Sequence, residues 1–307
     1  MSDPPSVEFG RIGVWSFDFV IAPVAVVRAA LASIEELGYA AVWYPEVPWS
    51  RESLSQAALL LGWSERVIVA SGIAGIFARD AVAMANGARG LVEAYPGRFL
   101  LGIGVSHAPL VAMRGGEYRR PLATMGAYLD AMDEAPYAPA DAAAPRVLAA
   151  LAPQMLGLAG ARAAGAHTYF VPPEHTALAR EVLGPRPLLA VEQAVVLETD
   201  RARAYELARA HMHPYLDLPN YRNNLLRLGF AEEELSDGGS DRLVDAIVAW
   251  GDVAAIEERV RARFAAGADH VAVQPLHAEP GGFPVETLAE LAPALLELGA
   301  AAARPSS

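Results

Sequence analysis

The stretch from residue 67 to residue 107 constrains the fold more than any other part of the chain. It reads VIVASGIAGIFARDAVAMANGARGLVEAYPGRFLLGIGVSH. Two short runs, Val67 to Ala70 and Phe99 to Ile103, are apolar throughout, and a helix-compatible segment, Asp80 to Ala94, separates them. Strands without polar alternation are expected where a parallel sheet is covered on both faces. The stretch therefore predicts a right-handed strand–helix–strand unit.

The same alternation continues on both sides of this unit. We expect strands at residues 11–16, 39–44, 67–70, 99–103, 146–150, 166–171, 188–197 and 270–274. Helices are expected between them, such as 23–37, which begins with Pro and ends before Gly38. The segment 216–250 is longer than a connection requires and predicts an inserted group of helices after the seventh strand. The tail, residues 300–307, is expected to be disordered.

Eight strands alternating with helices predict a (β/α)8 TIM barrel, formed by residues 1–307 as a single α/β domain. The competing fold is a doubly wound sheet, whose glycine fingerprint should follow the first strand. No glycine occurs between Trp15 and Gly38, and the pair Gly102 and Gly104 lacks a third glycine at the required spacing. The barrel is therefore favoured.

Several function classes are disfavoured by residues that the chain lacks. It has neither lysine nor cysteine, which argues against Schiff-base chemistry, a Walker A lysine, thiol catalysis and cysteine metal sites. A net charge of −12 argues against a nucleic-acid partner. No apolar stretch is long enough for a membrane span, and the N-terminus lacks a signal-peptide pattern. We expect a cytoplasmic protein that acts on a small molecule.

Barrel enzymes assemble their sites at the carboxyl ends of the strands, and these ends are unusually apolar and aromatic here. Such a surface suits a flat ring system, which Gly72 would allow to approach the backbone closely. The seven histidines are scattered, so no metal site is expected. Glu46 and Glu192 leave open a glycosidase-like hydrolase, which needs two carboxylates a few ångströms apart.

Several motifs together resemble one known family. Gly72-Ile73 with Arg79-Asp80, the run from Gly97 to Gly104 and the run from Gly104 to Leu110 are similar to the strand-three and strand-four signature of the luciferase-like monooxygenase superfamily. More narrowly, the chain resembles the branch of oxidoreductases that use coenzyme F420. Further matching stretches are Tyr128-Leu129-Asp130, residues 220–229 and residues 266–271.

The resemblance implies a barrel with an insertion after the seventh strand and a non-proline cis peptide, Gly72–Ile73, behind the deazaflavin ring. His107 stands where some relatives have a catalytic Glu, and Val47 where some have a catalytic His. The residues that we expect to contact the cofactor are Trp15, Glu46, Ser71, Gly72, Ile73, Val105, Ser106, Ala150, Leu151 and Ala152.

These observations lead to a functional hypothesis. We expect an F420-dependent oxidoreductase, a homodimer, that transfers a hydride between C5 of the deazaflavin and a small organic substrate. His107 would protonate the substrate or stabilise charge, and Glu46 would bind the ring. The substrate side would be lined by Trp49, Glu192 and Tyr221. The alternatives are an FMN-dependent luciferase-like monooxygenase, the glycosidase-like hydrolase and a non-catalytic ligand-binding barrel.

Overall fold

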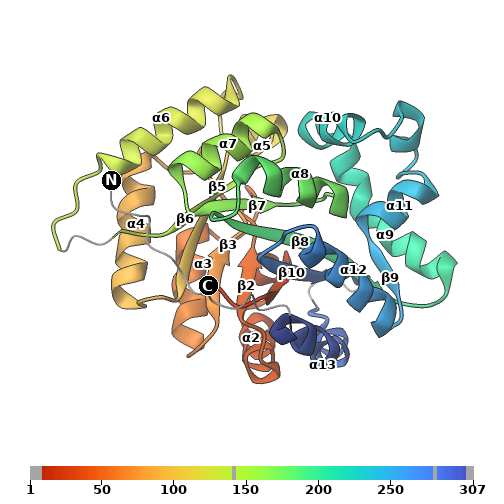
Figure 1. Ribbon diagram of the computed structural model, residues 1–307. Helices are drawn as coiled ribbons and strands as arrows, with labels where there is room; N and C mark the ends of the chain where they lie inside the picture. Colours follow the sequence, from red (N-terminus) through yellow and green to blue (C-terminus); the bar gives the residue numbers. More distant parts are fainter. Residues whose placement is uncertain (1–8, 140–142, 279–281, 302–307) are drawn as a thin grey trace.

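The computed structural model describes residues 9–139, 143–278 and 282–301. Eight parallel strands form a closed barrel (Figure 1), because β10 pairs with both β1 and β8. The predicted TIM barrel is therefore correct. The barrel strands are β1 (Ile12–Trp15), β2 (Ala41–Tyr44), β3 (Ile68–Ser71), β5 (Phe99–Gly104), β6 (Arg146–Ala149), β7 (Gly165–Thr168), β8 (Leu188–Leu197) and β10 (His270–Pro275).

The strands are apolar throughout because each of them contributes to two cores. Trp15 of β1 lies in the cluster that fills the inside of the barrel, whereas its neighbour Val14 lies in the cluster between the barrel and its helices. Trp43 and Val42 of β2 divide in the same way, and all four side chains are buried. Burial on both faces removes the polar alternation of a half-exposed strand.

The helices surround this barrel, and several begin or end at the capping residues that the sequence provides. Asp80 accepts a hydrogen bond from the amide of Ala83 at 2.9 Å, and Gly38 ends α2 with a φ of 95°. The helices of the barrel are α1 (Asp18–Ile21), α2 (Val24–Leu37), α3 (Ser53–Trp63), α4 (Ala81–Ala94), α5 (Ala108–Met113), α6 (Pro121–Asp133), α7 (Pro153–Arg162), α8 (Pro173–Leu183), α12 (Val253–Ala265) and α13 (Val285–Ala301).

The predicted insertion, residues 216–250, lies within a longer segment between β8 and α12. This segment, which we call the insertion from here on, gathers on one side of the barrel, near α8 and β8 (Figure 1). After α9 (Arg201–Leu216) come α10 (Pro219–Arg227), the 3₁₀ helix η1 (Glu232–Leu235) and α11 (Asp241–Ile247). The segment ends in a strand that we did not predict, β9 (Ala249–Gly251), which pairs in parallel with the last residues of β8. The insertion is therefore hydrogen-bonded to the barrel sheet at its end.

The structure also differs from the sequence-based expectations at the end of β7, after β3 and at the end of the last helix. The chain leaves β7 at Thr168 and not at Val171, because Phe170 adopts a left-handed conformation with φ 56°. A two-residue strand, β4 (Ala74–Gly75), lies between β3 and α4 and pairs with β5. Helix α13 continues to Ala301, so the prediction of disorder is wrong for residues 300 and 301; residues 302–307 lie outside the described residues. No helix in the described ranges is both long enough and apolar enough to cross a membrane.

Candidate functional site

The carboxyl ends of the eight barrel strands, with the loops that follow them, form what we call the mouth of the barrel. The structure places there most of the residues predicted from the sequence. Glu192 lies within β8 and not at its end, and Trp49 is 64% exposed in the loop between β2 and α3. The others are Trp15 at the end of β1, Glu46 after β2, Ser71, Gly72 and Ile73 at and after the end of β3, Val105, Ser106 and His107 after β5, Ala150, Leu151 and Ala152 after β6, and Tyr221 in α10.

The chain bulges after β3, where the peptide bond between Gly72 and Ile73 is cis, as the family resemblance implied. The end of β2 holds both sides of this bulge. The amide of Gly72 donates to the carbonyl of Tyr44 at 2.7 Å, and the amide of Glu46 donates to the carbonyl of Ile73 at 3.1 Å. The bulge is therefore fixed by backbone hydrogen bonds from the neighbouring strand.

Two glycines of β5 provide the space for this bulge. A Cβ on Gly102 would lie 1.9 Å from the carbonyl oxygen of Ser71, and one on Gly104 would lie 2.8 Å from Cδ1 of Ile73. The hydroxyl of Ser71 also donates to the carbonyl of Gly102 at 2.8 Å and accepts from its amide at 2.9 Å. Close approach of backbone to backbone explains why glycine stands at position 102. Ser71 thus joins β3 to β5.

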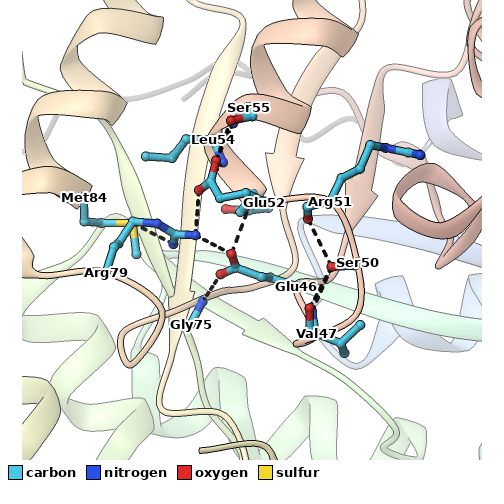
Figure 2. Close-up of polar contacts among 12 residues, drawn as sticks. Glu46, Val47, Ser50, Arg51, Glu52, Leu54, Ser55, Gly75, Arg79 and Met84 are labelled. Atoms are coloured by element: carbon cyan, nitrogen blue, oxygen red, sulfur yellow. Dashed lines mark hydrogen bonds and ion pairs between the residues drawn. The ribbon is translucent and has the colours of Figure 1, made fainter. Parts of the chain in front are cut away.

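Glu46 is held by several donors on one side of the mouth (Figure 2). Its carboxylate accepts from the amide of Gly75 at 2.8 Å and from that of Ser53 at 3.3 Å, and it pairs with Arg79. Arg79 also pairs with Glu52 at 2.6 Å, and the side chain of Glu46 is only 3% exposed. The carboxylate therefore connects β2, the bulge and the start of α3. Its catalytic and cofactor-binding roles stay predictions.

Glu192 is buried inside the barrel beneath the insertion. One carboxylate oxygen, Oε2, accepts from the amide of Phe170 at 3.1 Å, and this bond helps to hold the left-handed turn after β7. The other oxygen, Oε1, has no hydrogen-bond partner. Burial raises the pKa of Glu192 to about 7, although Arg263 and the amide of Phe170 oppose the shift. A carboxyl group with this pKa can carry a proton at neutral pH.

Aromatic side chains of the insertion cover the mouth near β7. The hydroxyl of Tyr169 donates to Gln274 at 3.1 Å and lies 2.8 Å from the hydroxyl of Tyr215. Phe170 contacts Tyr215 and Tyr221 with ring centroids 4.9 and 5.4 Å apart. Tyr215 was not predicted from the sequence, although its position six residues before the predicted Tyr221 was an available signal. The insertion thus adds an aromatic wall to the mouth.

A second polar group lies after the ends of β1 and β10, and its histidine was not predicted from the sequence. Ser16 donates from its hydroxyl to Asp18 at 2.7 Å, and Nε2 of His277 lies 2.9 Å from the same carboxylate oxygen. Ser16 and Asp18 are buried, whereas the side chain of His277 is 24% exposed. The cluster places a carboxylate and an imidazole at the mouth, on strands far apart in sequence.

Deeper inside the barrel, three neutral rings form a polar network. Nε1 of Trp43 donates to Nε2 of His270 at 3.0 Å, and His270 donates from Nδ1 to the carbonyl of Gly10. The indole of Trp43 also stacks on His167, with ring centroids 4.5 Å apart. Burial lowers the pKa of His167 to about 3 and that of His270 to about 4, so both rings stay neutral.

The mouth has the composition that a bound flavin-like ring requires. Ile73 packs over Gly104 beside Ala149, which gives an apolar surface. Buried polar atoms without a hydrogen-bond partner include Nε1 of Trp15 at the end of β1 and Oε1 of Glu192 inside the barrel. Buried polar atoms are normally paired, and ligand sites combine apolar walls with a few such groups. Because flavin and deazaflavin rings carry both carbonyl oxygens and N–H groups, these residues fit such a cofactor.

The geometry does not favour the other chemistries that the sequence left open. The carboxylate of Glu46 lies against α3 and the bulge, whereas that of Glu192 lies against β7, so each is held by its own neighbours. A hydrolase would need the two carboxylates to act on one bond. Across the described ranges, no group of three or more His, Asp and Glu side chains could hold a metal ion.

Solved structures with the same fold include enzymes that use two related cofactors. An F420-dependent secondary alcohol dehydrogenase in complex with an F420–acetone adduct matches with a TM-score of 0.74 and 13% identity, over 94% of this chain and 99% of that chain. The coenzyme F420-dependent tetrahydromethanopterin reductase from Methanopyrus kandleri matches with a TM-score of 0.74 and 15% identity, over 92% and 97%.

A third solved structure contains FMN. The oxygenating constituent of 3,6-diketocamphane monooxygenase from Pseudomonas putida, in complex with FMN, matches with a TM-score of 0.66 and 15% identity, over 94% of this chain and 96% of that chain. A comparison with curated proteins finds no significant match. The family model for luciferase-like monooxygenases matches residues 20–270. The chain therefore belongs to the luciferase-like monooxygenase family.

Proposed function

We propose that this protein is an F420-dependent oxidoreductase that transfers a hydride between C5 of the deazaflavin and a small organic substrate. The observation that carries the proposal is His107, an imidazole in the loop after β5 that is held at the mouth by Asn220 and Tyr221. Hydride transfer at an oxygen-bearing carbon requires that a proton moves as well, and an imidazole is suited to that task. The two F420-dependent structures also match with higher TM-scores than the FMN-containing one.

The residues of the mouth divide into groups with different tasks in this proposal. The coenzyme supplies the hydride chemistry when it is bound, and the protein supplies binding and orientation. Glu46 braces the bulge on which the ring would rest, and Trp15 forms the wall beside it. The ring and its tail would contact Ser71, Gly72, Ile73, Val105, Ser106, Ala150, Leu151 and Ala152, and the substrate would lie toward Trp49, Glu192 and Tyr221.

A fluorescence titration with oxidised F420 and, separately, with FMN tests the cofactor assignment. We expect tighter binding of F420. Ala152→Trp, which fills the loop after β6, should abolish binding, whereas Ala161→Trp on the exposed far end of α7 should not. Turnover is then measured on a panel of secondary alcohols and the corresponding ketones, since one structural neighbour is a secondary alcohol dehydrogenase.

Each outcome of the titration assigns the protein differently. Preference for FMN would refute the F420 proposal and favour an FMN-dependent monooxygenase. FMN is the cofactor bound in the structure of the diketocamphane monooxygenase. Binding of neither cofactor would overturn the oxidoreductase proposal. Tight F420 binding without turnover on any substrate would favour a non-catalytic binding protein.

A further inference from the structure

The insertion contacts the predicted catalytic imidazole directly. Nδ1 of His107 lies 3.1 Å from the side-chain oxygen of Asn220, and the ring of Tyr221 lies next to it, with centroids 5.4 Å apart. His107 precedes α5, whereas Asn220 and Tyr221 are the second and third residues of α10. Two consecutive residues of the insertion therefore determine the surroundings of His107.

The chemistry of this contact fixes the position of the proton on the ring. An amide oxygen can only accept a hydrogen bond, so Nδ1 of His107 must be the donor. A neutral imidazole carries one N–H, and Nε2 therefore keeps its lone pair.

The ring is neutral at pH 7 in these surroundings. Burial lowers the pKa of His107, and the bond to Asn220 only partly offsets this shift. No charged side chain of the described structure contributes to the shift. The titratable ring beside it, Tyr221, is itself neutral, because burial raises its pKa far above the usual value.

We propose that Asn220 is a positioning residue that holds His107 as the Nδ1–H tautomer, so that Nε2 acts as the proton acceptor of the reaction. This inference rests on the proposed oxidoreductase function. In the oxidising direction the O–H bond of a hydroxyl substrate breaks and its proton moves to Nε2 of His107. The oxidised coenzyme, when bound, would accept the hydride from the carbon that carries this hydroxyl group, and the C=O bond would form at that carbon. From the sequence we expected His107 to donate a proton to the substrate or to stabilise charge. In this geometry the neutral ring, with a lone pair on Nε2, accepts a proton.

A consequence is that the reaction requires the insertion to be docked. When α10 moves away, His107 loses the partner that selects its tautomer. The proposed proton acceptor therefore depends on a hydrogen bond between the barrel and the insertion, formed by two residues 113 positions apart.

The tautomer can be measured on the protein without any cofactor. Two-bond 1H–15N correlation spectra of 15N-histidine-labelled protein distinguish a protonated ring nitrogen from one with a lone pair. The resonances of His107 are assigned from those that disappear in His107→Gln. In the wild type we expect Nδ1 to be protonated and Nε2 to carry the lone pair.

Three variants test the role of Asn220. Asn220→Ala should change the tautomer of His107, and Asn220→Asp should raise its pKa by about one unit or more through the carboxylate. Asn223→Ala, an exposed asparagine on the same helix, should change neither. In the loaded enzyme, Asn220→Ala should lower kcat with little change in KM, and Asn220→Asp should shift the acidic limb of the pH profile upward with the His107 pKa.

Two results would overturn the inference. The first is a neutral His107 with its proton on Nε2 in the wild type. The second is an Asn220→Ala variant that melts at the wild-type temperature and shows an unchanged His107 tautomer. The F420 titration is independent of these spectra. If F420 does not bind while the tautomer is as expected, the proposed function fails but the positioning contact stands. If F420 binds and the tautomer is wrong, only the role of Asn220 fails.

Discussion

Four neutral histidines should make the fold unstable in mild acid. Burial lowers the pKa of His167 to about 3, and it lowers the pKa values of His175, His211 and His270 to about 4. In the unfolded chain each imidazole would titrate near its usual pKa of about 6.5. Below that pH the unfolded chain binds a further proton at each of these four rings, so stability is lost as the pH falls from about 6.5 toward 4.

The size of the effect follows from the pKa differences. Lowering the pH from 7 to 5 lowers the free energy of unfolding by about 2 kcal/mol for each histidine, or about 8 kcal/mol for the four. Glu192 acts in the opposite direction, because its raised pKa of about 7 means that the folded protein binds its proton first. It raises the free energy of unfolding by about 2 kcal/mol over the same range. The net loss of about 6 kcal/mol is a large share of a typical free energy of unfolding.

Urea unfolding at pH 7 and pH 5, followed by circular dichroism, measures this difference. His175→Gln removes one titrating ring, and its amide can still donate to the carbonyl of Leu151, as Nε2 of His175 does at 2.8 Å. The variant should lose about 2 kcal/mol less than the wild type between the two pH values. The exposed His213→Gln should lose as much as the wild type. Equal wild-type stability at both pH values would refute the reasoning.

Three further substitutions probe the mouth, with urea unfolding as the measurement. Gly102→Ala should destabilise the fold by about 3 kcal/mol or more, because its Cβ would meet the carbonyl oxygen of Ser71. Gly126→Ala, in open space on α6, should stabilise the fold by up to about 1 kcal/mol. Equal effects of the two substitutions would contradict the close approach of the backbone at Gly102. Arg79→Met should cost about 3 kcal/mol by leaving the buried carboxylate of Glu46 unpaired, and a neutral result would show that the backbone amides suffice. Glu192→Gln should stabilise the protein by about 3 kcal/mol at pH 8 and leave its stability unchanged at pH 4, because burial destabilises only the ionised carboxylate. Equal stabilisation at both pH values would contradict this explanation.

The barrel could be predicted from the sequence because its strands are covered on both faces and therefore apolar throughout, as Val14 and Trp15 illustrate. The two short strands β4 and β9 could not, because two or three residues carry no pattern. They pair with residues of β5 and β8 that lie beyond the residues paired with β3 and β7. The ends of helices with capping residues, such as Gly38, were also readable.

The candidate site was predictable where it depends on position along a strand. Trp15 and His107 follow from the rule that barrel sites lie at the carboxyl ends of strands. The partners of these residues were not predictable, because they depend on how distant segments dock. Arg79 beside Glu46 and Asn220 beside His107 are examples, separated by 33 and 113 positions in the sequence. Local patterns contain no information about such pairs.

The parallel pairing of β8 with β9 makes the insertion an exchangeable module. Leu197, where β8 ends, is the register partner of Gly251, where β9 ends and α12 follows. Partners on neighbouring strands lie about 5 Å apart, so residues 198–251 leave the barrel and return to nearly the same point. A short linker could replace them without moving any of the eight barrel strands. Protein engineering can therefore exchange the helices over the mouth while the eight strands of the barrel are kept.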